Sequence, residues 1–571
     1  MTTAAPLPMQ SGLLFGRRLQ QSMTRETQPA PQDWSPKVPS LSIMDEEKTL
    51  APVSAEVRPQ IQLADAGTLS RPIGTLEMFF KRLGEFAVSA NREHAAFFTV
   101  VQLRFPSEVI NPEDYIARAW EVVGRRFPAL RAEVSPPDAA NPQGPSGFTV
   151  RPFNKESFKS SFSIHPDAAN VDELFAAPSP MRSTATCYWL PKPGQIILRT
   201  SHWRADGFGQ ILLTDVFMTT LANIIERGLD GPLDESLTEL PLEGAITPGL
   251  EDLIRKYSTD SPADADAEVE AADADILMDQ LMNGGRSIAL PTIPGSEGAP
   301  ATTCSRAGIR MSAESSDELS RACRAQGVSV TSALNAAIIR ATARYPQEPD
   351  TDAYVIFAPV DLRAPLIAAG AHECAQPTGT YVSGLPLRIE GVVARLEGGE
   401  SAPGKTFTAL ADELSAFYSQ DLLRYRRPGA GDGEKTVNLL RLADPYLERM
   451  AEFFATFRAP GCPYPKTPVI SSLGKMDGLV KRGYEYAGGA ARLEVTDFWV
   501  GIENATPMVT FHPWSWADEL TLSAAWNDSF YSTEIVVGAL EKIMEELGEG
   551  LNMEHVSYRI VSACCELSTR A

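Results

Sequence analysis

One stretch of the sequence limits the possible folds more than any other, because a strand pattern changes there directly into a helix pattern. Residues 196–200 are largely apolar and follow a Pro/Gly turn at residues 191–194, so we expect them to form the second strand of a β-hairpin. That strand runs straight into His202. Apolar positions then recur on one face of residues 208–225, which predicts a helix. The histidine therefore lies at a junction between a strand and a helix.

The residue types at this junction suit proton transfer. A nucleophile that attacks through a hydroxyl must lose its proton, and the imidazole of His202 titrates near neutrality and can accept it. Asp206 is placed to N-cap the predicted helix. Gly207 and Gly209 have no side chains, so a ligand could approach the backbone closely there. The alternative, which the pattern alone leaves open, is a histidine that packs in the core beside a capping aspartate.

Further strands and helices follow on both sides of the junction. Apolar and β-branched runs predict strands, and apolar residues at helical spacing predict helices. We expect strands at residues 97–105, 188–190, 309–311, 354–360, 385–389, 469–472 and 520–524, and helices beginning near residue 76 and covering residues 117–127, 316–325, 331–343 and 532–547. Strands mixed with helices over this length indicate an α/β protein of sandwiched layers.

The length of 571 residues is enough for more than one lobe. Residues 1–68 are rich in Pro, Ser, Thr and Gln and are predicted to be a disordered tail. We expect an N-terminal lobe over residues 69–305 and a C-terminal lobe over residues 306–571. Residues 230–275 are acidic and rich in Ala and Pro, which favours a solvated surface insertion or linker.

Charge and cysteine usage exclude several classes of function. A formal net charge of −22 argues against binding to nucleic acid or to anionic lipid. We identify no apolar run long enough to span a bilayer. The seven cysteines show no C-x-x-C spacing, so we expect no metal site. Their odd number, without a secretory signal, favours a reducing compartment, the cytoplasm.

The junction reads H-x-x-x-D-G at residues 202–207, and this motif resembles that of a known superfamily. The superfamily contains chloramphenicol acetyltransferase, carnitine acyltransferases, plant BAHD acyltransferases and the condensation domains of nonribosomal peptide synthetases. Other segments resemble it in the same order along the chain: residues 328–337, 359–363, 379–381, 470–475, 497–501 and 525–528. Within the superfamily, the chain is most similar to fungal secondary-metabolite O-acetyltransferases of the trichothecene 15-O-acetyltransferase type.

The resemblance implies a chloramphenicol-acetyltransferase-like fold with two lobes, each a mostly antiparallel sheet backed by helices. It also implies a tunnel between the lobes, which acyl-CoA enters from one mouth and the acceptor from the other. His202 would deprotonate a hydroxyl of a small molecule, such as a terpenoid or polyketide, and that oxygen would attack the thioester directly. Acetyl-CoA or another acyl-CoA would be a co-substrate, with no tightly bound cofactor. We expect a monomer.

The resemblance also assigns roles to single residues. Asp206 would pair with Arg363 and hold the loop that orients His202. Ser471 would donate a hydrogen bond to the oxyanion. Asp497 and Trp499 would maintain the fold. The phosphates of CoA would meet basic side chains that follow Ser471 in the sequence, although surface solvation is an equal alternative for them: Lys475, Lys481 and Arg482.

Two other hypotheses remain open from the sequence. The protein could be a standalone condensation-type enzyme that takes its acyl group from a carrier protein. Ser201 stands where condensation domains usually have a second histidine, which favours O-acyl transfer from CoA. The protein could also be a non-catalytic relative that only binds a ligand.

Overall fold

The structure is a computed structural model of the chain. It describes residues 62–64, 67–137, 144–233, 237, 246–257, 267–397, 400–422, 443–456, 464–485, 492–562 and 566–570. The chain divides into residues 1–50 and residues 51–571, and every described residue belongs to the second unit.

One sheet carries the junction that the sequence singles out. Its strand order is β17-β18-β3-β8-β7-β6, and all neighbours are antiparallel except β6 and β7. The strands are β3 (Phe97–Arg104), β6 (Phe162–Ile164), β7 (Thr186–Leu190), β8 (Gln195–Thr200), β17 (Gly483–Tyr484) and β18 (Leu493–Ile502). The β7–β8 hairpin confirms the strands predicted on either side of the Pro/Gly turn.

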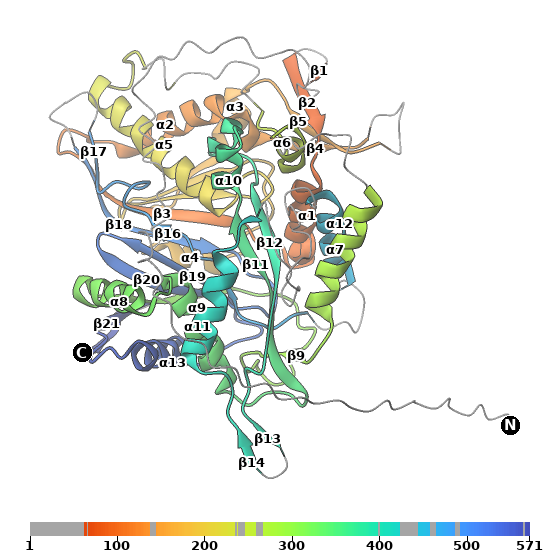
Figure 1. Cartoon of the computed structure of the whole chain (residues 1–571). Helices are drawn as coiled ribbons and strands as arrows, with labels where there is room; N and C mark the ends of the chain where they lie inside the picture. Colours follow the sequence, from red (N-terminus) through yellow and green to blue (C-terminus); the bar gives the residue numbers. More distant parts are fainter. Residues whose placement is uncertain are drawn as a thin grey trace. The chain divides into compact units, whose positions relative to one another are not determined.

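Two helices, α2 (Pro112–Arg126) and α5 (Gly207–Arg227), pack against each other over this sheet (Figure 1). Leu213, Phe217 and Leu221 of α5 are fully buried in the core between helices and sheet. Of the described helices, α5 is the one long and apolar enough to cross a membrane, which corrects the expectation that no such run exists. However, 67% of its apolar window is buried inside the protein, as in a core helix.

A second sheet has the order β15-β19-β20-β10-β21-β22, and β16 also pairs with β19. Its strands are β10 (Cys304–Met311), β15 (Val469–Ile470), β16 (Gly474–Lys475), β19 (Thr510–Trp516), β20 (Glu519–Asn527), β21 (Tyr558–Ser562) and β22 (Glu566–Arg570). Its apolar residues share a core with helices α8 (Ala313–Gln326), α9 (Val330–Ala343), α11 (Phe407–Tyr418) and α13 (Thr533–Leu551).

A long antiparallel hairpin brings a further segment to the junction. It consists of β11 (Thr351–Asp361) and β12 (Val382–Glu390), with β9 (Arg286–Ser287) parallel to β11. Between its strands lie α10 (Arg363–Ala368) and the 3-10 turn η7 (His372–Ala375). The first residue of α10 is therefore placed directly after the end of β11.

Three helices from distant parts of the chain pack side by side, namely α1, α7 and α12 (Figure 1). They are α1 (Thr75–Gly84), which continues into the 3-10 helix η2 (Glu85–Ala90), α7 (Ala267–Met282) and α12 (Ala443–Thr456). A short helix, α6 (Leu250–Tyr257), shares a core with α1. The remaining elements are β1 (Gln62–Ala64), β2 (Thr68–Pro72), η3 (Pro128–Arg131), β4 (Glu133–Ser135), β5 (Gly147–Val150), α3 (Lys155–Lys159), α4 (Val171–Ala176), β13 (Arg395–Glu397) and β14 (Glu400–Ala402).

Two predictions about segments without regular secondary structure need correction. Residues 62–64 form β1, which pairs with β2, so the chain is structured before residue 69; residues 1–61 lie outside the described residues. The acidic segment 230–275 is not only a solvated linker. It contains α6, whose Leu250, Leu253 and Ile254 are buried, because these apolar side chains share one face of the helix.

The α/β class is confirmed, with mixed and mostly antiparallel sheets backed by helices. The lobe boundary at residues 305/306 stays a prediction. The sheet that contains β3 and β8 also takes in β17 and β18 from beyond that boundary. The second half of the chain thus contributes to the sheet from which the junction emerges.

Candidate active site

His202 follows β8 directly, as the sequence predicts, and a loop after α10 holds it from the other side. The Thr380 hydroxyl donates a 3.0 Å hydrogen bond to the main-chain carbonyl of His202. The Gly379 amide donates to the Arg204 carbonyl at 2.8 Å, and Ala205 and Gly379 form an isolated parallel bridge. The turn between β8 and α5 is therefore fixed by main-chain contacts to residues 379–381.

The His202 ring is half-buried and stacks on Phe80 of α1, with ring centroids 3.8 Å apart and an interplanar angle of 6°. Its Nδ1 atom is buried and has no partner on another residue in the described part of the chain. Burial lowers the pKa of His202, while Asp206 and the residue's own carbonyl act in the opposite direction. The imidazole is therefore neutral near pH 7, as a general base must be.

Asp206 is fully buried and caps α5. Its Oδ1 accepts a hydrogen bond from the Gly209 amide at 2.8 Å, as an N-cap side chain does. Its Oδ2 accepts from the Tyr381 amide at 2.7 Å and from Arg363 Nη1 at 2.8 Å. The carboxylate thus connects the start of α5 to the loop and helix that follow β11.

Arg363 is the buried cation of this pair, with an exposed fraction of 3%. Its guanidinium also contacts Asp361 at 3.1 Å and donates from Nε to the Cys374 carbonyl at 3.1 Å. Burial disfavours the charge, but Asp206 and Asp361 outweigh that effect and raise the pKa of Arg363. The structure contains the Asp206–Arg363 pair that the resemblance implies, and the two residues are 157 positions apart in the sequence.

Gly207 and Gly209 differ in how closely other residues pack against them. A Cβ on Gly209 would stand 2.7 Å from the Pro377 carbonyl oxygen and 3.0 Å from Arg363 Nη2. The protein itself therefore fills the space that a Cβ of Gly209 would take, and ligand binding at Gly207 and Gly209 stays a prediction. A Cβ on Gly207 would meet the Phe97 ring at 3.3 Å and Leu473 at 3.7 Å.

Leu473 belongs to the segment in which Ser471 was expected to serve as oxyanion donor. The Ser471 amide donates to the Phe511 carbonyl at 2.8 Å, so this segment continues along β19 after β15 has ended at Ile470. The Ser472 hydroxyl is engaged with Thr331 at 2.9 Å. A Cβ on Gly207 would lie 3.7 Å from Leu473, so the segment reaches the start of α5. The role of Ser471 stays a prediction.

The three basic residues expected to meet CoA phosphates lie at the surface. Lys475 is exposed in β16. Lys481 stands 3.7 Å from Asp215, and Arg482 pairs with Asp518 at 2.7 Å. Two of the three cations are therefore already paired with carboxylates, and CoA binding by them stays a prediction.

A surface pocket of about 550 Å³ lies beside the junction, with Lys81, Arg182, Trp203 and Arg204 among its lining residues. His202 is not in the lining. A tunnel that reaches His202 thus stays a prediction. Among the described residues, no group of three or more His, Cys, Asp or Glu side chains is arranged to hold a metal ion.

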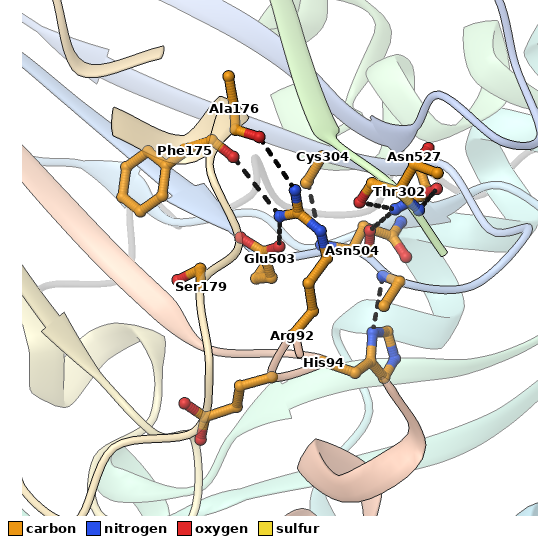
Figure 2. Close-up of polar contacts among 12 residues, drawn as sticks. Arg92, His94, Phe175, Ala176, Ser179, Thr302, Cys304, Glu503, Asn504 and Asn527 are labelled. Carbon is orange, nitrogen blue, oxygen red and sulfur yellow. Dashed lines mark hydrogen bonds and ion pairs between the residues drawn. The ribbon is translucent and has the colours of Figure 1, made fainter. Parts of the chain in front are cut away.

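Sequence reasoning did not identify a second histidine near the first. His94 lies just before β3 and is buried, and its Nδ1 accepts a 3.2 Å hydrogen bond from the Ala505 amide. Burial, with a smaller contribution from His202, lowers the pKa of His94 to about 4. Figure 2 shows His94 beside the buried Arg92–Glu503 ion pair, whose atoms are 2.6 Å apart. No periodic pattern marks this histidine in the sequence.

Comparisons with known proteins agree with this geometry. The family model described as the phthiocerol/phthiodiolone dimycocerosyl transferase C-terminus matches residues 300–379. The trichothecene 15-O-acetyltransferase TRI3 of Fusarium sporotrichioides aligns with a TM-score of 0.64 at 15% identity, over 88% of this chain and 99% of that one.

Two curated fungal proteins are similar over most of their length. The protein named loline biosynthesis cluster 1 transcription factor lolU1, from Epichloe uncinata, is 27% identical over 87% of this chain and 98% of its own. Acetyltransferase pigO, from Monascus ruber, is 23% identical over 84% of this chain and 96% of its own. Taken with the H-x-x-x-D-G junction and the fold, these similarities support an acyl-transferring enzyme that resembles the superfamily of CoA-dependent acyltransferases and condensation domains.

Proposed function

We propose that the protein is an O-acyltransferase that moves an acyl group from acyl-CoA to a hydroxyl of a small-molecule secondary metabolite. The observation that carries the proposal is the half-buried imidazole of His202, with its lowered pKa, held at the junction by the buried Asp206–Arg363 pair. The acetyltransferase pigO and the 15-O-acetyltransferase TRI3 support an acetyl group and an alcohol acceptor.

In the proposed reaction, His202 Nε2 takes the proton of the acceptor hydroxyl while its oxygen attacks the thioester carbonyl. The carbonyl oxygen becomes an oxyanion, for which we propose Ser471 as the donor; loss of such a donor typically lowers the rate by about 10²–10³. The tetrahedral intermediate expels the CoA sulfur, which takes the proton from the imidazolium. No acyl-enzyme is formed, and the histidine returns to its neutral state.

A different function is suggested by the name of one relative, lolU1, which is called a transcription factor. Direct binding to DNA requires a basic face that displaces counterions, whereas this chain has a formal net charge of −22. We therefore favour acyl transfer. A condensation-type enzyme with a carrier-protein donor remains the second candidate.

Thiol release from acetyl-CoA tests the proposal when it is measured with a panel of terpenoid and polyketide alcohols. We expect turnover with at least one alcohol, and we expect H202A to lower kcat by at least about 10² without changing the thermal melting curve. Near-wild-type kcat in H202A would contradict the mechanism. Activity with a phosphopantetheinyl carrier thioester alone would instead favour the condensation-type enzyme.

A further inference from the structure

Aromatic rings from distant segments of the chain stand in mutual contact beside His202. We call them the ring set: Phe79 and Phe80 of α1, Phe86 of η2, Phe357 of β11, Phe454 of α12, and Tyr464. Figure 1 shows that α1 and α12, which carry three of these rings, lie side by side.

The ring set begins at the candidate base. Phe80 stacks on His202 with centroids 3.8 Å apart, and Phe79 meets Phe80 edge to face at 5.1 Å. Phe454 then packs against Phe79 at 5.3 Å and against Phe357 at 5.5 Å. The three separations between phenylalanine rings are typical of aromatic pairs that attract each other.

The ring set also reaches a second histidine. Tyr464 lies 6.5 Å from Phe454 and 5.6 Å from Phe86, measured between centroids. Phe86 in turn makes an edge contact of 6.4 Å with His94, the histidine on which the charge of His202 acts. The rings thus lead from one side of His202 to a second residue in its neighbourhood.

Most rings of the ring set are not completely buried in the core. Phe80, Phe86, Phe357, Phe454 and Tyr464 are all half-buried, so each keeps surface that a ligand can cover.

The helix that carries Phe79 and Phe80 is held rigidly. Arg71 donates two hydrogen bonds to Glu77 in the first turn of α1, and both side chains are buried. The Leu76 amide donates to Glu251 of α6 at 2.8 Å. Because its start is fixed in this way, α1 presents its rings in a preorganised position, which reduces the entropy lost on binding.

We propose that the ring set binds the acceptor and that the acceptor is a flat, conjugated alcohol. The inference rests on the proposed acyl transfer and specifies its substrate class. Phe80 covers one face of the imidazole, so a hydroxyl reaches Nε2 along the ring edge. A flat conjugated ring system attached to that hydroxyl can stack on the aromatic rings of the ring set or contact their edges. A saturated ring system of similar size offers only apolar contact.

Two matched alcohols test the substrate class, 2-naphthalenemethanol and its saturated counterpart, decahydro-2-naphthalenemethanol. With acetyl-CoA as donor, we expect the wild-type kcat/KM to be at least about tenfold higher for the aromatic alcohol. F454L should reduce that preference at least about fivefold, because kcat/KM should fall more for the aromatic alcohol than for the saturated one. The control F153L, at a half-buried ring that packs against Arg125, should behave as wild type.

Equal use of the two alcohols by the wild type, or an equal loss for both in F454L, would overturn the inference. Calorimetry of 2-naphthalenemethanol binding in the absence of acyl-CoA separates failure of the ring-set inference from failure of the proposed function. If no acetyl transfer occurs, binding that F454L weakens at least about fivefold and F153L leaves unchanged still supports the ring set. Absence of binding to the wild type contradicts it.

Discussion

Replacement of Arg363 by Met tests how strongly the buried ion pair holds the junction. Asp206 has an exposed fraction of 0% and accepts three hydrogen bonds, of which R363M removes the charged one. A carboxylate left buried with only two amide donors typically costs about 3–5 kcal/mol. We expect a loss of that size in the free energy of unfolding, measured by urea denaturation and tryptophan fluorescence.

Two further variants sharpen this prediction. R321M removes a similar cation from an exposed pair with Asp317, whose side chains are 63% and 68% exposed, and should cost less than about 0.5 kcal/mol. The double variant D206N/R363M removes both buried charges and should be more stable than R363M alone. The reasoning is refuted if R363M loses no more stability than R321M, or if the double variant is the less stable of the two.

Three more predictions concern packing and protonation. G209A should destabilise the protein by about 1–3 kcal/mol, because the added Cβ would lie 2.7 Å from a main-chain oxygen. The control G538A in α13, where the nearest atom to the added Cβ lies at 3.8 Å, should be neutral or stabilising. Thermal melting of both variants compares them. Burial lowers the pKa of His512 to about 4. Between about pH 6.5 and 4, the unfolded chain binds a proton at His512 that the folded chain does not bind, so the free energy of unfolding falls as the pH falls. The fall is up to about 1.4 kcal/mol per pH unit. H512F should reduce this dependence of stability on pH, measured by urea titrations at several pH values. The lowered pKa of His202 predicts that kcat/KM falls on the acidic side with an apparent pKa below the usual 6.5 of histidine, and a midpoint above 6.5 would contradict it.

The junction could be predicted from the sequence because its signals are local. The β7–β8 hairpin, the capping role of Asp206 and the apolar face of α5 are each encoded within a few residues. The contact between Asp206 and Arg363 is not local, and only the resemblance to a family suggested it. The role of Gly209 could not be predicted, since the sequence shows a missing Cβ but not the Pro377 carbonyl that stands beside it.

The surroundings of the base were harder to predict because they depend on segments without strong patterns. The acidic composition of residues 230–275 concealed α6, in which three apolar residues form the buried face. Glu251 of that helix accepts a hydrogen bond from α1, and α1 places Phe80 on His202. Neither contact leaves a trace in the spacing of residues along the chain.

The buried pair has a chemical consequence as well as a structural one. A carboxylate near an imidazole favours the protonated form and would leave the base unable to accept a proton at neutral pH. Here the charge of Asp206 is balanced by Arg363 and by two main-chain amides. Burial has a larger effect on His202 than Asp206 has, so the pKa of the imidazole is lowered rather than raised. Burial thus keeps His202 neutral near pH 7 although the carboxylate of the pair lies in its neighbourhood.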